Sequence, residues 1–405
     1  MLGASFAAGL CAVGVDVEAL GVVPTGCISY VARTQGFGLG GVISASHNPA
    51  PDNGIKLMGC DGRKLSEEAE LRIERFMDAD GLPCPTGGGV GWLNASAELT
   101  AAYSEFLIGL LPERLDGMKL AVDTANGAAY AMAPKMLREL GAEVVTLGDE
   151  PDGMNINREC GATSPEAVQK LVCDTGADLG ISFDGDADRA VFCDETGRLI
   201  NGDRTMAIWC VHWGDSSRFD PKVVVGTVMS NGGFEQYLNA SGIQLVRTPV
   251  GDKHIGARLV ELGGKIGGEQ SGHIIFSEHA PTGDGLVTAL ELLRVIRREG
   301  RPASSYVAAF DNWPQTLINV AVDNCGDWES RPEIVDALSR AEEALAGRGR
   351  VVVRASGTQP LIRVMVEADD AALRDSEASR IVAALKSALN GSVYSQVDLT
   401  HALGD

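Results

Sequence analysis

The segment MKLAVDTANG, residues 118–127, has the pattern of a short buried strand, a glycine turn and the start of a helix. The same order recurs at KVVVGTVMSNGG, residues 222–233, and another short apolar strand is expected at DLGISFD, residues 178–184. Continuous apolar strands that alternate with helices are typical of parallel strands buried on both faces of a sheet. The pattern therefore predicts an α/β fold built from a repeated strand–turn–helix unit.

Breaks in this pattern divide the chain into four expected domains. The first three, residues 1–115, 116–215 and 216–310, are related α/β mixed-sheet domains in series. Residues 311–405 have a different pattern, with paired strands and two long helices. This pattern predicts a C-terminal α+β domain that ends in a loose polar tail from Asn390.

Composition excludes several classes of protein. The 405 residues contain 34 Lys and Arg against 55 Asp and Glu, a net charge of −21, whereas nucleic-acid and anionic-membrane binders need a basic surface. No apolar run approaches the roughly 20 residues that span a bilayer. The nine cysteines are scattered without a C-x-x-C pair, which argues against a disulfide framework and a thiolate metal site. We expect a cytoplasmic protein that binds neither nucleic acid nor membrane.

The segment ISASHNPAPDNGIKL, residues 43–57, follows the apolar strand GLGGV. It places Ser46 and His47 in a turn at the carboxyl end of a strand, which is where open α/β sheets bind their ligands. The alternative is that this segment is only a polar surface loop with Asn-Pro and Asp-Asn-Gly turns and has no role in function.

The segment FDGDADR, residues 183–189, carries three alternating carboxylates. Asp184, Asp186 and Asp188 would point the same way from an extended backbone, and a divalent cation would relieve their repulsion. Hard oxygen ligands without a neighbouring His or Cys favour one Mg²⁺ per chain. A calcium loop needs glycine where Arg189 stands, and a solvated acidic loop is the remaining alternative.

Two further loops carry polar groups that suit a sugar phosphate. In GGEQSGHIIF, residues 267–276, we expect an acceptor, a hydroxyl and an imidazole to alternate outward and recognise hydroxyl groups. In RASGTQP, residues 354–360, a forked guanidinium, two hydroxyls and a glycine that lets backbone amides converge suit a phosphate. The residues concerned are Glu269, Ser271 and His273 in the first loop and Arg354, Ser356, Gly357 and Thr358 in the second.

The four loops together indicate phosphoryl transfer on a sugar phosphate held in a central cleft, because a nucleophile, a metal site, a hydroxyl-reading loop and a phosphate clamp lie on four successive domains. The motifs SASHNP, DGDADR, GEQSGH and RASGTQP, in this order, resemble those of the α-D-phosphohexomutase family over essentially the whole chain.

The resemblance implies four domains around a cleft and a phosphoserine at Ser46, whose phosphate oxygen binds Mg²⁺ together with Asp184, Asp186 and Asp188. It implies sugar contacts from Glu269, Ser271 and His273, and phosphate contacts from Arg354, Ser356, Gly357 and Thr358. Lys56 matches a lysine implicated in proton transfer, and His47 and Arg189 match residues that line the same cleft.

Within that family, GEQSGH, DTANGAAY and NINRECG are similar to the members that act on glucosamine phosphates. The resemblance then implies interconversion of glucosamine 6-phosphate and glucosamine 1-phosphate, with glucosamine 1,6-bisphosphate as intermediate and activator and a homodimer as a possible assembly. The alternatives are the same chemistry on mannose or glucose phosphates, which Gln270 disfavours, and a sugar-phosphate-binding remnant without catalysis. A hydrolase of the DxDxT type is disfavoured, because Asp188 stands where its threonine would be.

Members of the family open with a segment resembling FGTDGIRG and a strand ending in GRDTR, ahead of the helix expected here from residue 2. We therefore expect the first domain to be incomplete at its N-terminus and to expose a sheet edge. A start codon assigned too far downstream is the favoured explanation, and a short, catalytically impaired chain is the alternative.

Overall fold

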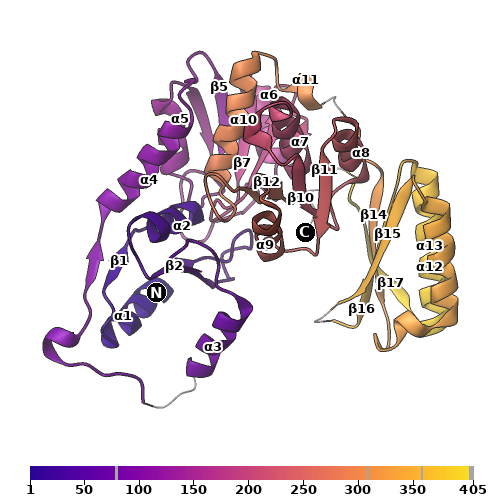
Figure 1. Ribbon diagram of the computed structural model, residues 1–405, viewed down its shortest axis with the longest axis horizontal. Coiled ribbons are helices and arrows are strands. Elements are labelled where there is room, and N and C mark those ends of the chain that lie inside the picture. Colours follow the sequence, from indigo (N-terminus) through magenta and orange to yellow (C-terminus); the bar gives the residue numbers. More distant parts are fainter. Residues whose placement is uncertain (78–80, 308–309, 357–358, 401–405) are drawn as a thin grey trace.

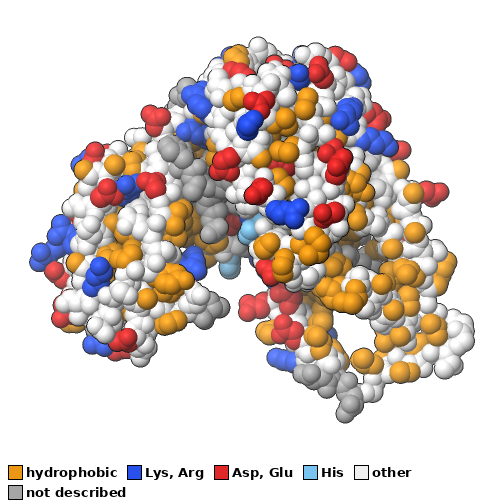
Figure 2. Space-filling view, turned by 180° about the vertical axis from the view of Figure 1, so that it is seen from behind, with side chains coloured by type: hydrophobic (Ala, Val, Ile, Leu, Met, Phe, Trp, Pro, Cys, Tyr) orange, Lys and Arg blue, Asp and Glu red, His pale blue; other side chains and the backbone are white. Residues whose placement is uncertain are grey.

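The computed structural model describes residues 1–77, 81–307, 310–356 and 359–400. Figure 1 shows the N-terminal elements at one end, the second and third domains packed together in the middle, and the last sheet with its two helices at the other end. Figure 2 shows the surface hollowed between the C-terminal and N-terminal domains, with histidine side chains in the hollow. No helix among the described residues is both long and apolar enough to cross a membrane.

The first domain contains two separate pairs of strands. Strands β2 and β3 are antiparallel, with Val42 opposite Lys56, and β1 is parallel to β4. Val42 is buried on the face that α2 covers. The loop with Ser46 is the connection between β2 and β3. The elements are α1 (Leu2–Ala12), β1 (Val17–Ala19), α2 (Thr25–Thr34), β2 (Leu39–Ile43), β3 (Ile55–Gly59), α3 (Glu67–Met77), the 3₁₀ turn η1 (Gly87–Gly89), β4 (Leu93–Ala95) and α4 (Ala97–Leu110).

The second domain is built on a five-stranded sheet of order β6-β5-β7-β8-β9. Strands β5, β6 and β7 are parallel and β8 is antiparallel to β7, so the sheet is mixed, as expected. Every residue of β7 and β8 is buried, which matches their continuous apolar pattern. The aspartate loop connects these two strands. The elements are β5 (Lys119–Asp123), α5 (Met132–Glu139), β6 (Glu143–Leu147), α6 (Glu166–Thr175), β7 (Leu179–Phe183), β8 (Ala190–Asp194), β9 (Leu199–Ile200) and α7 (Gly202–Trp213), and the 3₁₀ turn η2 (Ser217–Phe219) follows at the start of the third domain.

The third domain repeats this plan with the strand order β11-β10-β12-β13. Strand β12 is parallel to β10 and antiparallel to β13, and the GEQSGH loop connects β12 to β13. The metal and sugar motifs therefore occupy equivalent hairpins of two related sheets. The elements are β10 (Val223–Thr227), α8 (Gly232–Ala240), β11 (Gln244–Thr248), α9 (Asp252–Leu262), β12 (Ile266–Gly268), β13 (Ile274–Phe276), α10 (Gly285–Glu299) and α11 (Ser304–Val307).

The fourth domain is an antiparallel sheet of order β15-β16-β14-β17 with two helices on one face. Its core, around Val320, Ile334 and Val364, is separate from the one large core that the other three domains share. The RASGTQP loop connects β15 to β16. The elements are β14 (Gln315–Ala321), η3 (Trp328–Ser330), α12 (Pro332–Leu345), β15 (Gly349–Ala355), β16 (Leu361–Ala368), α13 (Ala371–Leu389) and β17 (Ser392–Asp398).

The expectation of a loose tail from Asn390 was wrong for residues 392–398. They form β17, which pairs with β14 from Thr316 to Ala321. The edge of β14 offers unpaired backbone groups, and the β-forming residues Val393, Tyr394 and Val397 complete the sheet there. Residues 401–405 lie outside the described chain.

Candidate active site

Ser46 lies at the tip of the β2–β3 connection in a strained conformation. Its φ is 55°, a left-handed value that is uncommon for any residue with a Cβ atom. The backbone amide of Ser46 donates to the hydroxyl of Ser44 at 2.8 Å, and the Ser46 hydroxyl donates to Asp184 Oδ2 at 2.8 Å. Strain of this kind concentrates at functional sites, because surrounding contacts must hold it. The serine predicted as nucleophile thus meets the first predicted metal ligand across 138 residues of sequence.

The three predicted metal ligands are buried together. Asp184 is fully buried and Asp186 and Asp188 are each 3% exposed. Their carboxylate oxygens lie within 4.8 Å of one another. Burial, followed by the charges of Asp188 and Asp186, raises the pKa of Asp184 to about 8. The Oδ1 atoms of Asp186 and Asp188 are buried and have no hydrogen-bond partner in the part of the chain that the structure describes. Unsatisfied hard oxygens held this close together suit Mg²⁺.

Two basic side chains face the carboxylates. Lys56, on β3, donates to Asp186 Oδ2 at 2.5 Å and to Asp188 Oδ2 at 3.2 Å. Although burial alone would lower the pKa of Lys56, the charges of Asp188 and Asp186 raise it above its usual value. The Nε atom of Arg189 lies 4.0 Å from both Asp184 Oδ2 and Asp188 Oδ1. The ammonium and guanidinium groups therefore offset part of the negative charge.

Thr25 is a member of this cluster that the sequence analysis missed. It is fully buried at the first turn of α2. Its hydroxyl donates to Asp186 Oδ2 at 3.0 Å, and its backbone amide donates to the Asp186 carbonyl at 2.9 Å. The only sequence signal was a threonine after proline at a helix start, which is ordinary capping chemistry.

The GEQSGH loop does not alternate outward as expected. Residues 269–272 form a tight turn in which Gly272 has a φ of 87° and donates to the Glu269 carbonyl, so the strand alternation stops there. His273 is 4% exposed, with Nδ1 3.4 Å from Asp188 Oδ1 and Nε2 3.6 Å from Asp252 Oδ2. Burial lowers the pKa of His273, but the charge of Asp188 and then that of Asp252 raise it overall. The imidazole therefore faces carboxylates.

The other two residues of this loop are held differently. Glu269 accepts a hydrogen bond from the backbone amide of Gly251 at 3.1 Å, and Ser271 is 7% exposed. Gln270, the residue that separates the glucosamine pattern from the others, is 3% exposed and donates to the buried Asp203 at 3.1 Å. Gln270 is therefore held against the first turn of α7 and supports the shape of the loop.

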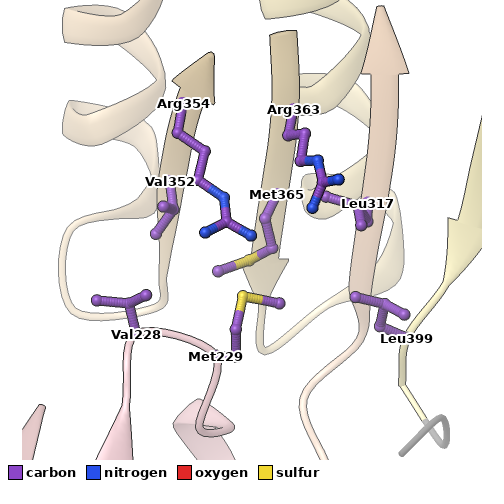
Figure 3. A pocket seen from close by; sticks show the side chains of 8 residues that line it. All are labelled: Val228, Met229, Leu317, Val352, Arg354, Arg363, Met365 and Leu399. Carbon is purple, nitrogen blue, oxygen red and sulfur yellow. The ribbon is translucent and has the colours of Figure 1, made fainter. Parts of the chain in front are cut away.

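The fourth predicted loop lies apart from the other three. Arg354 at the end of β15 and Arg363 on β16 are cross-strand partners, and Figure 3 shows both side chains extending on the same side of the sheet toward Met229. They line a cavity of about 50 Å³ whose lining residues include no carboxylate. Burial lowers the pKa of Arg354, and the charge of Arg363 lowers it further. Like charges placed directly opposite destabilise a sheet, so an anion between them would be favourable.

Arg363 was also missed by the sequence analysis. The signal was present in LIRVMVEA, where one arginine interrupts an apolar strand, but its partner became evident only from the β15–β16 register. Of the remaining predicted residues, Ser356 and His47 are half-buried in their loops. Gly357 and Thr358 lie outside the described residues.

A second group of possible ligands, Glu278, His279 and Glu291, has a different character. The fully buried Glu291 accepts hydrogen bonds from Arg218 at 2.8 Å and from Arg294 at 2.6 Å. Two guanidinium groups already neutralise these carboxylates, so the cluster is an internal ion-pair network.

Comparison with known proteins places this geometry in a family. Models of four phosphoglucomutase/phosphomannomutase domains match in order: alpha/beta/alpha domains I, II and III at residues 1–82, 101–197 and 201–313, and the C-terminal domain at residues 317–384. Phosphoglucosamine mutase of Desulforamulus reducens is 46% identical over 374 residues, which cover 92% of this chain and 84% of that protein.

Solved structures agree in fold. A phosphoglucomutase/phosphomannomutase family protein of Burkholderia thailandensis superposes with a TM-score of 0.78 at 25% identity, covering 96% of this chain and 86% of that one. N-acetylphosphoglucosamine mutase of Aspergillus fumigatus, solved with GlcNAc-6P and magnesium, superposes with a TM-score of 0.65 at 20% identity, covering 90% and 92%. The chain therefore belongs to the phosphoglucomutase/phosphomannomutase family of α-D-phosphohexomutases.

Proposed function

We propose that this chain is an isomerase that interconverts glucosamine 6-phosphate and glucosamine 1-phosphate through a phosphoserine at Ser46. The observation that carries the proposal is the hydrogen bond of 2.8 Å between the strained Ser46 hydroxyl and Asp184, within a buried aspartate trio. Curated relatives at 45–48% identity are phosphoglucosamine mutases, which supports the glucosamine substrate over mannose or glucose phosphates.

The proposed reaction moves one phosphoryl group in each direction. The bond between phosphorus and Ser46 Oγ breaks while a hydroxyl oxygen of the sugar phosphate bonds to phosphorus, and the hydroxyl proton leaves to a base. The product is glucosamine 1,6-bisphosphate. After this intermediate turns over in the cleft, the bond between its other phosphorus and the sugar oxygen breaks while Ser46 Oγ bonds to that phosphorus, and the freed sugar oxygen takes the proton back from the base.

Asp184, Asp186 and Asp188 would hold Mg²⁺, whose charge stabilises phosphoryl oxygens when it is bound. Lys56 and Arg189 add positive charge beside the same carboxylates. Two carboxylates keep the Lys56 ammonium protonated, so its first role is electrostatic. Lys56 can accept a proton only when other positive charge faces those carboxylates.

We assign the far phosphate of the substrate to the last domain. Arg354 and Arg363 present two guanidinium groups on one side of the sheet, next to the loop that carries Ser356. Glu269 is the residue of the GEQSGH loop best placed to accept from a sugar hydroxyl, because His273 is buried between carboxylates. The domain limits at residues 115, 215 and 310, a homodimer and a cytoplasmic location stay predictions.

The test is turnover by this chain with Mg²⁺ and a trace of bisphosphate, on glucosamine 6-phosphate and on glucose and mannose 6-phosphates. We expect the highest kcat/KM on glucosamine 6-phosphate and a mass shift of one phosphate on the peptide that contains Ser46. Highest kcat/KM on mannose or glucose 6-phosphate would favour the alternative substrate. Binding of the sugar phosphates without turnover on any of them would favour the non-catalytic remnant.

A further inference from the structure

Asn157 of the second domain bonds the serine loop of the first. Its Nδ2 atom lies 3.0 Å from the carbonyl oxygen of Ser46 and 3.0 Å from that of Asn48. A primary amide has two hydrogens, and both are used on this loop. One side chain therefore fixes the direction of two carbonyl groups on either side of His47.

Asn157 is itself held firmly in the loop between β6 and α6. Its φ is 56°, which asparagine tolerates better than most residues, and its backbone amide donates to the Ala125 carbonyl at 2.9 Å. A Cβ on Gly161 would lie 2.8 Å from the Ala125 Cβ and 3.3 Å from Asn157 Oδ1. The Asn157 side chain is thus closely packed on the side of Gly161.

The aspartate loop also touches this contact. A Cβ on Gly185 would lie 2.5 Å from the Ser46 carbonyl oxygen and 2.8 Å from Asn157 Nδ2. Gly185 separates Asp184 from Asp186, so the serine loop, the asparagine and the metal-binding loop meet at one point. A shift of the Ser46 carbonyl would change the position of the Ser46 hydroxyl relative to Asp184.

We propose that Asn157 is a positioning residue, whose two hydrogen bonds hold Ser46 in its left-handed conformation and keep the Ser46 hydroxyl on Asp184. The inference rests on the proposed role of Ser46 as phosphoryl carrier. Without the two bonds, Ser46 relaxes toward the ordinary negative φ of L residues and its hydroxyl leaves Asp184. Among the described residues, Asn157 makes no hydrogen bond to the GEQSGH loop or to the arginine pair, so we expect substrate affinity to be unaffected.

Two variants separate the hydrogen bonds from the backbone. Asn157→Asp keeps the shape and replaces the donor by an acceptor, and Asn157→Gly removes the side chain while favouring a positive φ. Asn155→Asp is the matched control, since it adds the same charge two residues away, where the amide donates to the Glu150 carbonyl at 2.9 Å.

We expect both Asn157 variants to lose about 100-fold in kcat while KM for the sugar phosphate stays within about threefold, as for a misplaced reacting group. Asn155→Asp should behave as the unsubstituted chain. If Asn157→Asp does not fold, the kcat and KM of Asn157→Gly alone test the proposal. Unchanged kcat in Asn157→Gly, or a rise in KM with kcat unchanged, would overturn the proposal.

A second measurement separates this inference from the proposed function. Backbone amide exchange of residues 44–48 needs no turnover, and we expect it to be faster in Asn157→Gly than in the unsubstituted chain. Equal exchange rates would contradict the positioning role even in an active enzyme. If the unsubstituted chain has no mutase activity but exchange is faster in Asn157→Gly, the proposed function is rejected, whereas the role of Asn157 in holding the serine loop is supported.

Discussion

The Ser46 corner, by which we mean Ser46, Thr25, Lys56 and the three aspartates, differs from the last domain with Arg354 in how its side chains are held. The Ser46 hydroxyl, Lys56, Thr25 and the three aspartates are tied by direct hydrogen bonds between the first two domains, which share one core with the third. Arg354 and Arg363 stand on a sheet with its own core. One end of the site is thus preorganised for chemistry, whereas we expect the other, with its separate core, to move as a unit.

A buried carboxylate is one of the groups that join the last domain to the third. Glu367, fully buried on β16, accepts from the backbone amide of Gly232 at 2.9 Å and from Arg350 Nε at 2.9 Å. Arg350 also donates to the carbonyl of Ser230 at 2.7 Å. These polar contacts lie in the described parts of both domains, whose apolar cores are separate. We therefore expect substitutions in the corner to change kcat and substitutions in the last domain to change KM.

The largest effect is expected from Ser46→Ala. Removing the group that carries the phosphoryl should lower kcat at least about 1,000-fold, because the transfer then has no acceptor on the enzyme. Steady-state mutase assays would measure it, with Ser241→Ala, an exposed serine after α8, as control. Full activity in Ser46→Ala would show that another group carries the phosphoryl.

The next effect concerns the internal ion-pair network around Glu291, which Arg294 extends to Glu113 of the first domain. Burial by itself raises the pKa of Glu291, but the hydrogen bond from His279 and the charges of Arg294 and Arg218 lower it to about 2. A pKa depressed from its ordinary value near 4.5 adds roughly 3 kcal/mol above that pH, and this contribution is lost as the pH falls toward 2. Urea unfolding should show Glu291→Gln less stable at pH 7, with the difference shrinking below about pH 4.5. A pH-independent difference would mean that packing, and not charge, is lost.

Asp184→Asn should separate activity from stability in the same corner. We expect kcat to fall about 100-fold, because the metal site loses one charge and Ser46 loses its carboxylate acceptor. Melting in a chelator at about pH 9, above the pKa of about 8 that burial and the neighbouring carboxylates give Asp184, should occur at a higher temperature than for the unsubstituted chain, since one of three mutually repelling buried carboxylates becomes neutral. Asp174→Asn, an exposed aspartate paired with Lys170, is the control. A lower melting temperature in chelator would contradict the repulsion.

In the last domain, Arg354→Gln should raise KM about tenfold and leave kcat within about twofold, because one of two guanidinium groups on the phosphate is lost. Arg348→Gln, at an exposed pair with Asp369 in the same domain, should change neither constant. A loss confined to kcat would mean that Arg354 acts on the reacting group and that the two ends of the site are alike.

The smallest effect is expected at the junction itself. Glu367→Gln keeps the shape of the side chain but removes the charge that faces Arg350, so the last domain should be held less firmly and KM should rise about threefold. Small-angle scattering with and without sugar phosphate would show whether the domain changes position. An unchanged KM together with unchanged scattering would show that backbone contacts alone set the domain orientation.

Much of the fold and part of the site could be predicted from local sequence patterns. The alternation of apolar strands with glycine turns and helices predicted three related α/β domains and an α+β domain, and the spacing of Asp184, Asp186 and Asp188 predicted a cluster on one loop. Such features depend on residues that are neighbours along the chain, so periodicity and turn chemistry report them. The strand β17 was not predicted from the sequence, because this short polar run forms a strand only when it can pair with the edge of β14.

Only the tertiary structure decided which loops meet. Ser46 reaches Asp184, Thr25 reaches Asp186 and Asn157 reaches the serine loop through the packing of separate domains. Arg363 became a partner of Arg354 through strand register, and His273 and Gln270 turned inward because a tight turn replaced the expected alternation. These contacts join residues far apart in the sequence, and no local pattern encodes the burial and domain packing that bring them together.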